Sequence, residues 1–195
     1  MHMRIGVLAL QGDFEAHRRA VENAGAEAVE VRRAEELDSI DGLIVPGGES
    51  TTMLKLLHAE KLWDKLAAFG RVKPIFGTCA GAILLATKVT SPEQESLGLV
   101  DLEVQRNAYG RQIDSRIVQL EGEPGSGLEG HPVEAVFIRA PVIQSAGPGS
   151  KVLLRYQGKP VLVEHGSHMV ATFHPELTSD PTIHRKFLEK VRAAA

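Results

Sequence analysis

The chain has 195 residues, of which 43% are hydrophobic and 24% are charged, an ordinary balance for a globular protein. Its 22 basic and 25 acidic side chains give a formal net charge of −3 at pH 7, and no basic run of the nucleic-acid-binding type is present. The single cysteine cannot form an internal disulfide, and the sequence shows neither a signal-peptide pattern nor an apolar stretch of transmembrane length. We therefore expect one cytoplasmic domain that binds neither nucleic acid nor membrane.

Short apolar runs alternate with amphipathic segments through the first half of the chain. Residues 5–10, 28–31 and 42–45 are nearly continuously apolar, as expected of strands that are covered on both faces of a parallel sheet. Helices are predicted after the first run, with Asp13 as N-cap, and after the third run, around residues 53–57. This alternation predicts a doubly wound α/β fold with a mostly parallel sheet.

The second half of the chain has more polar alternation and more turns. A terminal helix is predicted with Asp180 as its cap and Pro181 at its first position. Residues 105–112 form a polar, turn-rich segment and residues 121–130 a Gly-rich loop. Strands are predicted over residues 99–104, 117–120, 133–138, 152–156, 161–164 and 169–173. We expect this half of the chain to belong to the same domain and to give it an antiparallel extension.

A cysteine stands between a predicted strand and a predicted helix. Residues 74–76 predict a buried strand, and residues 82–86 predict the start of a helix packed against it. Between them, Gly77-x-Cys79-x-Gly81 is the thiol counterpart of the nucleophile elbow, a sharp strand-to-helix turn that presents a reactive side chain. The N–H groups at the helix N-terminus favour a thiolate. A lone cysteine is most often a small buried hydrophobe, but this context favours a nucleophile at Cys79.

A glycine turn follows the third predicted strand, in the segment PGGESTT over residues 46–52. It is either a simple tight turn, with Ser50 or Thr51 as a helix cap, or a source of backbone N–H groups for an oxyanion. A phosphate loop is not favoured, because no Gly-Lys-Ser/Thr ending follows. Ligands of open α/β sheets collect at the carboxyl ends of strands, so this turn, the pair Gln11-Gly12 and Cys79 are candidates for one site.

His174-Pro175-Glu176 directly follows the last predicted strand. In an extended chain, residues two apart point to the same side with Cα atoms about 6.6 Å apart, and Pro175 disfavours a helix at His174. Glu176 can then orient one imidazole nitrogen while the other faces a nucleophile, as in the Ser-His-Asp triad. The alternative is a turn with an incidental surface histidine. The position at a strand's carboxyl end, like that of Cys79, favours an acyl-transfer site.

The other histidines are not expected to contribute to the site. His165 and His168 flank a turn, and the sequence has no Cys or His spacing of the zinc-binding type, so neither a metal nor another cofactor is expected. Four isolated histidines are predicted to be solvated surface residues: His17, His58, His131 and His184.

Several segments resemble a known family over nearly the whole length of the chain. They are PGGESTTM (46–53), FGTCAGAILLA (76–86), QRNAYGRQ (105–112), IRAP (138–141) and FHPELT (173–178). They resemble the glutaminase subunits of pyridoxal 5'-phosphate synthase, which belong to the triad-type (class I) glutamine amidotransferases. G-x-C-x-G with H-P-E is shared by the wider amidotransferase group, whereas ALQGDF (9–14), PGGESTTM and RNAYGRQ point to the vitamin B6 branch.

The resemblance implies a flavodoxin-like three-layer αβα fold, in a single glutamine amidotransferase domain over residues 1–195. It implies that Cys79 attacks the side-chain carboxamide of L-glutamine, giving a γ-glutamyl thioester and ammonia. His174 would transfer the protons and Glu176 would orient His174. The backbone N–H groups of Gly48 and Ala80 would form the oxyanion hole.

The same carry-over implies a set of substrate-binding residues. An arginine can hold the α-carboxylate of glutamine bidentately, but Arg106 or Arg139 could equally be a surface ion-pair residue, and the sequence does not decide between them. The implied set is Gly48, Glu49, Ser50, Arg106, Ile138 and Arg139.

The family's partner is a (β/α)-barrel synthase subunit that uses the ammonia to build pyridoxal 5'-phosphate, within a large hetero-oligomer. Gln11 is the predicted docking-sensitive position. Three alternatives stay open: a glutaminase serving another synthase, such as that of histidine or a nucleotide; a different cysteine hydrolase, such as a peptidase; and an inactive relative that acts only in assembly or regulation.

Overall fold

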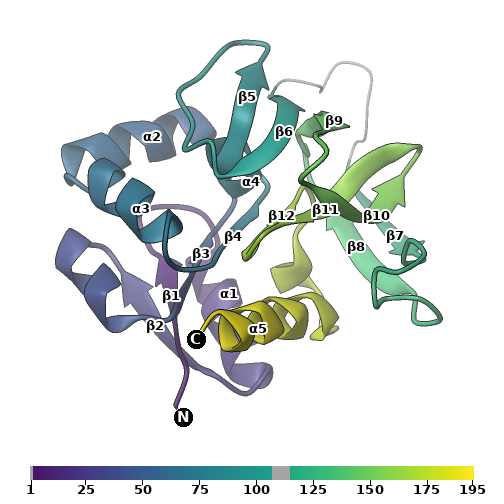
Figure 1. Cartoon of the computed structure of the whole chain (residues 1–195), viewed down its shortest axis with the longest axis horizontal. Coiled ribbons are helices and arrows are strands. Elements are labelled where there is room, and N and C mark those ends of the chain that lie inside the picture. Colours follow the sequence, from purple (N-terminus) through teal and green to yellow (C-terminus); the bar gives the residue numbers. More distant parts are fainter. Residues whose placement is uncertain (1, 107–114) are drawn as a thin grey trace.

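The computed structural model describes residues 2–106 and 115–195 (Figure 1). Its centre is a seven-stranded sheet with the strand order β10-β11-β12-β4-β3-β1-β2. The strands β2, β1, β3, β4 and β12 pair in parallel, and β11 and β10 extend the sheet antiparallel. Their bounds are β1 (Arg4–Leu8), β2 (Glu27–Val31), β3 (Gly42–Val45), β4 (Ile75–Thr78), β10 (Lys151–Tyr156), β11 (Lys159–His165) and β12 (His168–Ala171).

Helices cover both faces of this sheet. On one face lie α2 (Ser50–Ala59), α3 (Trp63–Gly70) and α4 (Ala80–Leu85), and on the other lie α1 (Phe14–Asn23) and α5 (Thr182–Ala194). Alternate residues of β3 therefore belong to two hydrophobic cores, one on each face of the sheet. Leu43 and Val45 pack with α2 and α3, whereas Ile44 packs with α5. The three-layer α/β architecture predicted from the sequence is confirmed.

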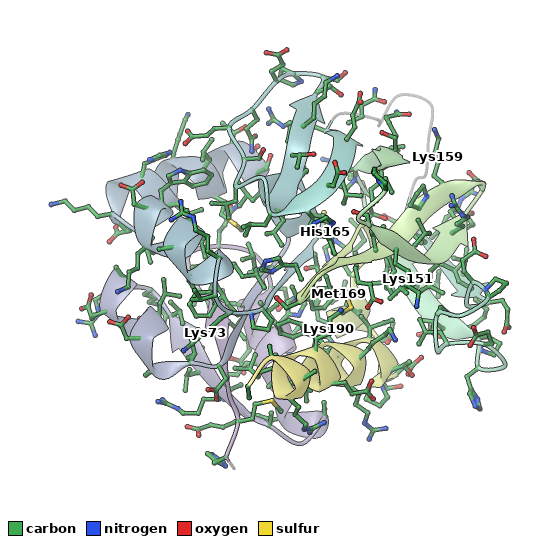
Figure 2. The ribbon with its side chains drawn as sticks, viewed as in Figure 1. Lys73, Lys151, Lys159, His165, Met169 and Lys190 are labelled. Atoms are coloured by element: carbon green, nitrogen blue, oxygen red, sulfur yellow. The ribbon has the colours of Figure 1, made fainter. Side chains whose placement is uncertain are left out.

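A lysine fixes α5 to the sheet through the turn between β11 and β12. Nζ of Lys190 donates a hydrogen bond to the carbonyl oxygen of Gly166 and lies 2.9 Å from Oε2 of Glu164. In Figure 2, Lys190 and Met169 of β12 lie close together where α5 crosses this part of the molecule. Met169 is fully buried beneath the helix. α5 thus covers the strand that leads to His174.

Two small sheets complete the described chain. One contains β5 (Ala86–Thr90), β6 (Val100–Gln105) and β9 (Val142–Ala146), and the other contains β7 (Arg116–Leu120) and β8 (Val133–Phe137) (Figure 1). Short 3₁₀ helices, η1 (Ala34–Ser39) and η2 (Pro175–Leu177), lie between larger elements. Among the described residues, no helix combines the length and the apolar character needed to cross a membrane.

The structure corrects several local predictions. Ala86 was predicted to be helical, but α4 ends at Leu85 and Ala86 begins β5. α5 begins at Thr182, one residue after Pro181, and the carboxylate of Asp180 accepts hydrogen bonds from the Thr182 N–H and hydroxyl. α3, β5, β9 and both 3₁₀ helices were not predicted. Residues 107–112 of the QRNAYGRQ segment lie outside the described part of the chain.

Candidate active site

Cys79 joins β4 to α4 in a sharp turn. Its backbone has φ 52° and ψ −109°, a region that non-glycine residues rarely adopt and that costs about 1–3 kcal/mol. The Cys79 N–H donates to the carbonyl oxygen of Ala171 at 2.8 Å, which holds the turn against β12. Side chains at the flanking glycines would clash, because a Cβ on Gly77 would lie 2.5 Å from the Gly81 oxygen and one on Gly81 would lie 2.1 Å from the Val45 oxygen. The elbow geometry predicted from the sequence is therefore present.

His174 and Glu176 follow β12 and lie beside this turn. The His174 N–H donates to the carbonyl oxygen of Val136 at 2.8 Å. Nδ1 of His174 lies 3.2 Å from Oε1 and 3.3 Å from Oε2 of Glu176, whose side chain is 1% exposed. A Cβ on Gly47 would lie 2.9 Å from Cε1 of His174 and 3.0 Å from Cβ of Cys79. Gly47 thus touches both side chains, and the three predicted catalytic residues lie together.

The charges of this cluster favour an ion pair. Burial lowers the pKa of His174, but hydrogen bonds with Cys79 and Glu176, and the charges of both groups, outweigh it and raise the pKa to about 10. Burial raises the pKa of Glu176, but its contacts with His17, followed by those with His174, hold it well below its usual range. The arrangement therefore stabilises an imidazolium at His174 and a carboxylate at Glu176.

A small cavity of about 60 Å³ opens beside the cysteine. The β3–α2 turn and the start of α4 both line this cavity. It therefore brings together residues from different segments that were predicted to bind the oxyanion and the substrate. Ala80, the first residue of α4, has no carbonyl within the helix for its N–H to reach. The lining residues are Gly48, Glu49, Ser50, Cys79, Ala80, Ile83, Arg106 and Pro141.

Some of the predicted substrate-binding side chains also have structural partners. Glu49 caps α2 by accepting hydrogen bonds from the Thr51 and Thr52 N–H groups, and these bonds, led by that of the Thr52 hydroxyl, lower its pKa to about 2. Ser50 Oγ donates to Gln94. Arg106 donates from Nη2 to the Thr51 hydroxyl, but its buried Nε has no hydrogen-bond partner within the described residues. Arg106 therefore retains a free donor beside the cavity.

The Ile138-Arg139 pair has a different placement. It follows β8 (Val133–Phe137), and both residues are exposed, Ile138 by 38%. Arg139 adopts φ 44°. Neither residue lines the small cavity, although Pro141 of the same segment does. The structure thus brings Arg106 to Cys79 more directly than it brings Arg139.

The prediction of surface positions for His17 and His184 was wrong. His17 on α1 is 0% exposed and His184 on α5 is 1% exposed. Nδ1 of His17 lies 3.0 Å from Nε2 of His184, and Nε2 of His17 lies 3.2 Å from Oε2 of Glu176. The helical periodicity carried the signal, because His17 is four residues from buried Val21 and His184 is three from buried Phe187. His58 and His131 do lie at the surface.

A three-layer α/β fold that brings a cysteine elbow, a histidine and a buried glutamate together at adjacent strand ends has an arrangement suited to acyl-transfer chemistry. A family model described as the SNO glutamine amidotransferase family matches residues 7–193, and the chain belongs to this family. The predicted family resemblance and the predicted enzyme class are thereby confirmed.

Relatives and a solved structure agree with this placement. The chain is 60% identical over 190 residues to the pyridoxal 5'-phosphate synthase subunit PdxT of Solibacter usitatus, covering 96% of this chain and 99% of that protein. It is 53% identical to the protein of the same name from Koribacter versatilis, covering 97% and 96% of the two chains. A crystal structure of a glutamine amidotransferase, 46% identical, superposes with a TM-score of 0.87 and covers 96% and 98% of the two chains.

Proposed function

We propose that this chain is the glutaminase subunit of a cytoplasmic pyridoxal 5'-phosphate synthase. As a single amidotransferase domain, it hydrolyses L-glutamine to L-glutamate and ammonia for vitamin B6 biosynthesis. Membership of the SNO family and the names of the relatives support this assignment. The observation that best supports it is that a Cβ built on Gly47 would lie 2.9 Å from Cε1 of His174 and 3.0 Å from Cβ of Cys79, so these two side chains approach the same point next to the cavity that Cys79 lines.

The proposed chemistry proceeds through a thioester. His174 accepts the Cys79 thiol proton, and Sγ attacks the side-chain amide carbon of glutamine. The N–H groups of Gly48 and Ala80 hold the resulting oxyanion. The C–N bond breaks as His174 returns the proton to the departing nitrogen, which leaves as ammonia and yields the γ-glutamyl thioester. His174 then deprotonates a water molecule that attacks the thioester carbon, and the C–S bond breaks to release glutamate and regenerate the thiol.

Substrate recognition is assigned to the cavity and its rim. The free Nε donor of Arg106 supports a role in binding the α-carboxylate of glutamine, because a guanidinium matches a carboxylate in shape and charge. Gly48, Glu49 and Ser50 supply the facing wall. Ile138 and Arg139, exposed after β8, are placed at the rim of this site in the proposal.

The ammonia passes to a (β/α)-barrel synthase subunit in a large hetero-oligomer. Gln11 is the proposed docking-sensitive residue, because its Nε2 donates to the Glu49 carbonyl oxygen and would lie 3.0 Å from a Cβ on Gly48. Any shift of Gln11 would therefore reach the turn that supplies an oxyanion donor. Unchanged synthase-stimulated glutaminase activity in Gln11→Ala would contradict this role.

Glutamine hydrolysis measured with and without a pyridoxal 5'-phosphate synthase barrel subunit tests the proposal. We expect stimulation by that subunit, and no ammonia from Cys79→Ala, which should still bind the partner. Stimulation only by a histidine or nucleotide synthase would reassign the acceptor. Turnover of peptides but not of glutamine would instead favour another cysteine hydrolase.

A further inference from the structure

A line of buried polar side chains continues from the catalytic cluster into the protein core. His17 of α1 also contacts Glu176: its Nε2 lies 3.2 Å from Oε2, the oxygen that Nδ1 of His174 approaches to 3.3 Å, and 3.1 Å from the hydroxyl of Thr78. Nε2 of His184 on α5 lies 3.0 Å from Nδ1 of His17. All four side chains are buried, so water does not satisfy these groups.

The surroundings fix where the protons of His17 and His184 lie. Glu176 is ionised and can only accept hydrogen bonds, so the His17 Nε2 that faces it carries a proton. Nδ1 of His184 is buried without a partner in the described chain, and leaving a lone pair unpaired there avoids burying an unpaired N–H. His184 is therefore protonated on Nε2 and donates to Nδ1 of His17. Burial lowers the pKa of His184 to about 3, which keeps this ring neutral.

Glu176 depends on its second neighbour. A buried carboxylate is costly unless hydrogen bonds or opposite charges compensate it. His174 supplies one such contact, but its imidazole gains and loses a proton during the proposed reaction. His17 contacts the same carboxylate from α1 and takes no part in those proton transfers. The titratable groups that face His17 are Glu176 from η2 and His184 from α5, and β4 contributes only the Thr78 hydroxyl.

Resting on the proposed catalytic roles of Cys79, His174 and Glu176, we propose that His17 is a positioning residue for the triad. It holds Glu176 in place and ionised, and His184 holds His17 in the tautomer that can do so. His17 is not among the residues that line the cavity. Its loss should therefore lower kcat and leave the KM for glutamine nearly unchanged.

The test compares His17→Met with His17→Gln in the full chain, assayed together with the synthase subunit. The two replacements have similar length and volume, but only Gln can donate a hydrogen bond toward Glu176. We expect His17→Met to lower kcat by about 10- to 100-fold, as for the loss of a hydrogen bond to a charged group. KM should stay within about twofold, and His17→Gln should recover most of the lost rate.

The pH profile separates this role from a merely structural one. His17 lowers the pKa of Glu176, so its removal raises that pKa, and a protonated Glu176 no longer stabilises the imidazolium of His174. The acidic limb of kcat should therefore move to higher pH in His17→Met and return toward the wild-type position in His17→Gln. Equal kcat values and superimposable pH profiles for His17→Met and the wild type would overturn the inference.

Two further comparisons make each outcome decisive. If the wild type with its synthase subunit releases no ammonia from glutamine, the proposed function fails. If the wild type is active and Cys79→Ala is inactive, then an unchanged kcat and pH profile in His17→Met refutes only the positioning role of His17. Should thermal unfolding show that His17→Met does not fold, His184→Met and His184→Gln form the second pair. For His184→Met we expect the acidic limb of the kcat–pH profile to shift in the same direction by a smaller amount. No shift at all would overturn the inference that His184 holds His17 in position.

Discussion

The α-carbon of Gly47 packs directly against the imidazole of His174, because a Cβ at this position would lie 2.9 Å from Cε1 of that ring. The same Cβ would lie 3.0 Å from Cβ of Cys79. The glycine turn after β3 therefore shapes the contact between the proposed nucleophile and its base, in addition to presenting a backbone N–H at Gly48.

Gly47→Ala should impair catalysis much more than folding. Its methyl group would push His174 or Cys79 out of alignment, and displacements of about 1 Å can cost on the order of 100-fold in rate. We expect that loss in kcat for glutamine hydrolysis. Gly25→Ala is the control, since its added methyl meets nothing within 4 Å and its φ of 99° affects stability alone. Wild-type activity in Gly47→Ala would contradict the packing argument.

Gly81→Ala should affect stability first. A Cβ here would lie 2.1 Å from the carbonyl oxygen of Val45, a backbone atom of a central strand that cannot move aside cheaply. Overpacking of this kind costs about 1–3 kcal/mol. Urea unfolding at neutral pH should show a lower transition midpoint with an unchanged m-value, and an unchanged midpoint would show that α4 can shift away from β3 at little cost.

The alkaline limit of activity should depend on Glu176. In the proposed mechanism His174 must be protonated to release ammonia, and its pKa is raised to about 10, in part by the hydrogen bond and charge of Glu176. Activity should therefore fall only near pH 10 in the wild type. In Glu176→Gln the negative charge is lost, so the alkaline limb should move to lower pH. Initial rates of glutamine hydrolysis between pH 7 and 11 measure this, with light scattering to check that the protein stays assembled.

His184 should weaken the protein in mild acid. Its pKa falls from 6.5 to about 3 on folding, so below pH 6.5 the unfolded chain binds a proton that the folded chain rejects. Stability is therefore lost progressively as pH falls from 6.5 toward 3. Replacing His184 by Met should reduce the drop in unfolding free energy between pH 7 and 5 by about 1–2 kcal/mol.

Urea titrations of both proteins at the two pH values test this prediction. The pKa of His168 is also lowered, mainly by burial, and it contributes in the same window, so His168→Met is the matched comparison. An identical pH dependence for His184→Met and the wild type would mean that the ring is solvated or charged in the folded protein.

Arg106 should govern glutamine affinity. Its free Nε donor beside the cavity predicts that Arg106→Lys, which cannot bind a carboxylate bidentately, raises KM by about tenfold or more with a smaller effect on kcat. Arg139→Lys is the paired measurement, because this exposed residue does not line the cavity. A larger rise in KM for Arg139→Lys than for Arg106→Lys would reverse the assignment.

Much of the fold was predictable because it depends on local patterns. Apolar runs such as residues 42–45 marked strands buried on both faces, and glycines around Cys79 marked the strand-to-helix turn. Helix α3 and strands β5 and β9 went unpredicted. Strand β9 pairs with β6, which lies in a distant part of the chain, so its own sequence gives little sign of the pairing. Ala86 was assigned to the helix because apolar runs alone do not separate a buried helix end from the strand that follows it.

The site was predictable where its residues are adjacent in sequence or stand at the carboxyl ends of predicted strands. His174 and Glu176 are two residues apart, so their contact follows from local geometry. His17 joins Glu176 through tertiary packing of α1 against η2, and a histidine within an amphipathic helix gives little sign of it. Only the alignment of each histidine with its helix's apolar face pointed inward, and that signal is ambiguous for a residue of intermediate polarity.

The hydrogen bond from Cys79 N–H to the Ala171 oxygen has a mechanical consequence. It connects Cys79 to β12, the strand that ends shortly before His174. The two side chains are therefore held by neighbouring, hydrogen-bonded strands of one sheet. Separating Cys79 from His174 would require breaking hydrogen bonds between β4 and β12 in the middle of the sheet. A bound partner could therefore change activity at the lowest energetic cost by moving the Gly48 turn. Such a movement would alter oxyanion and substrate binding without separating Cys79 from His174.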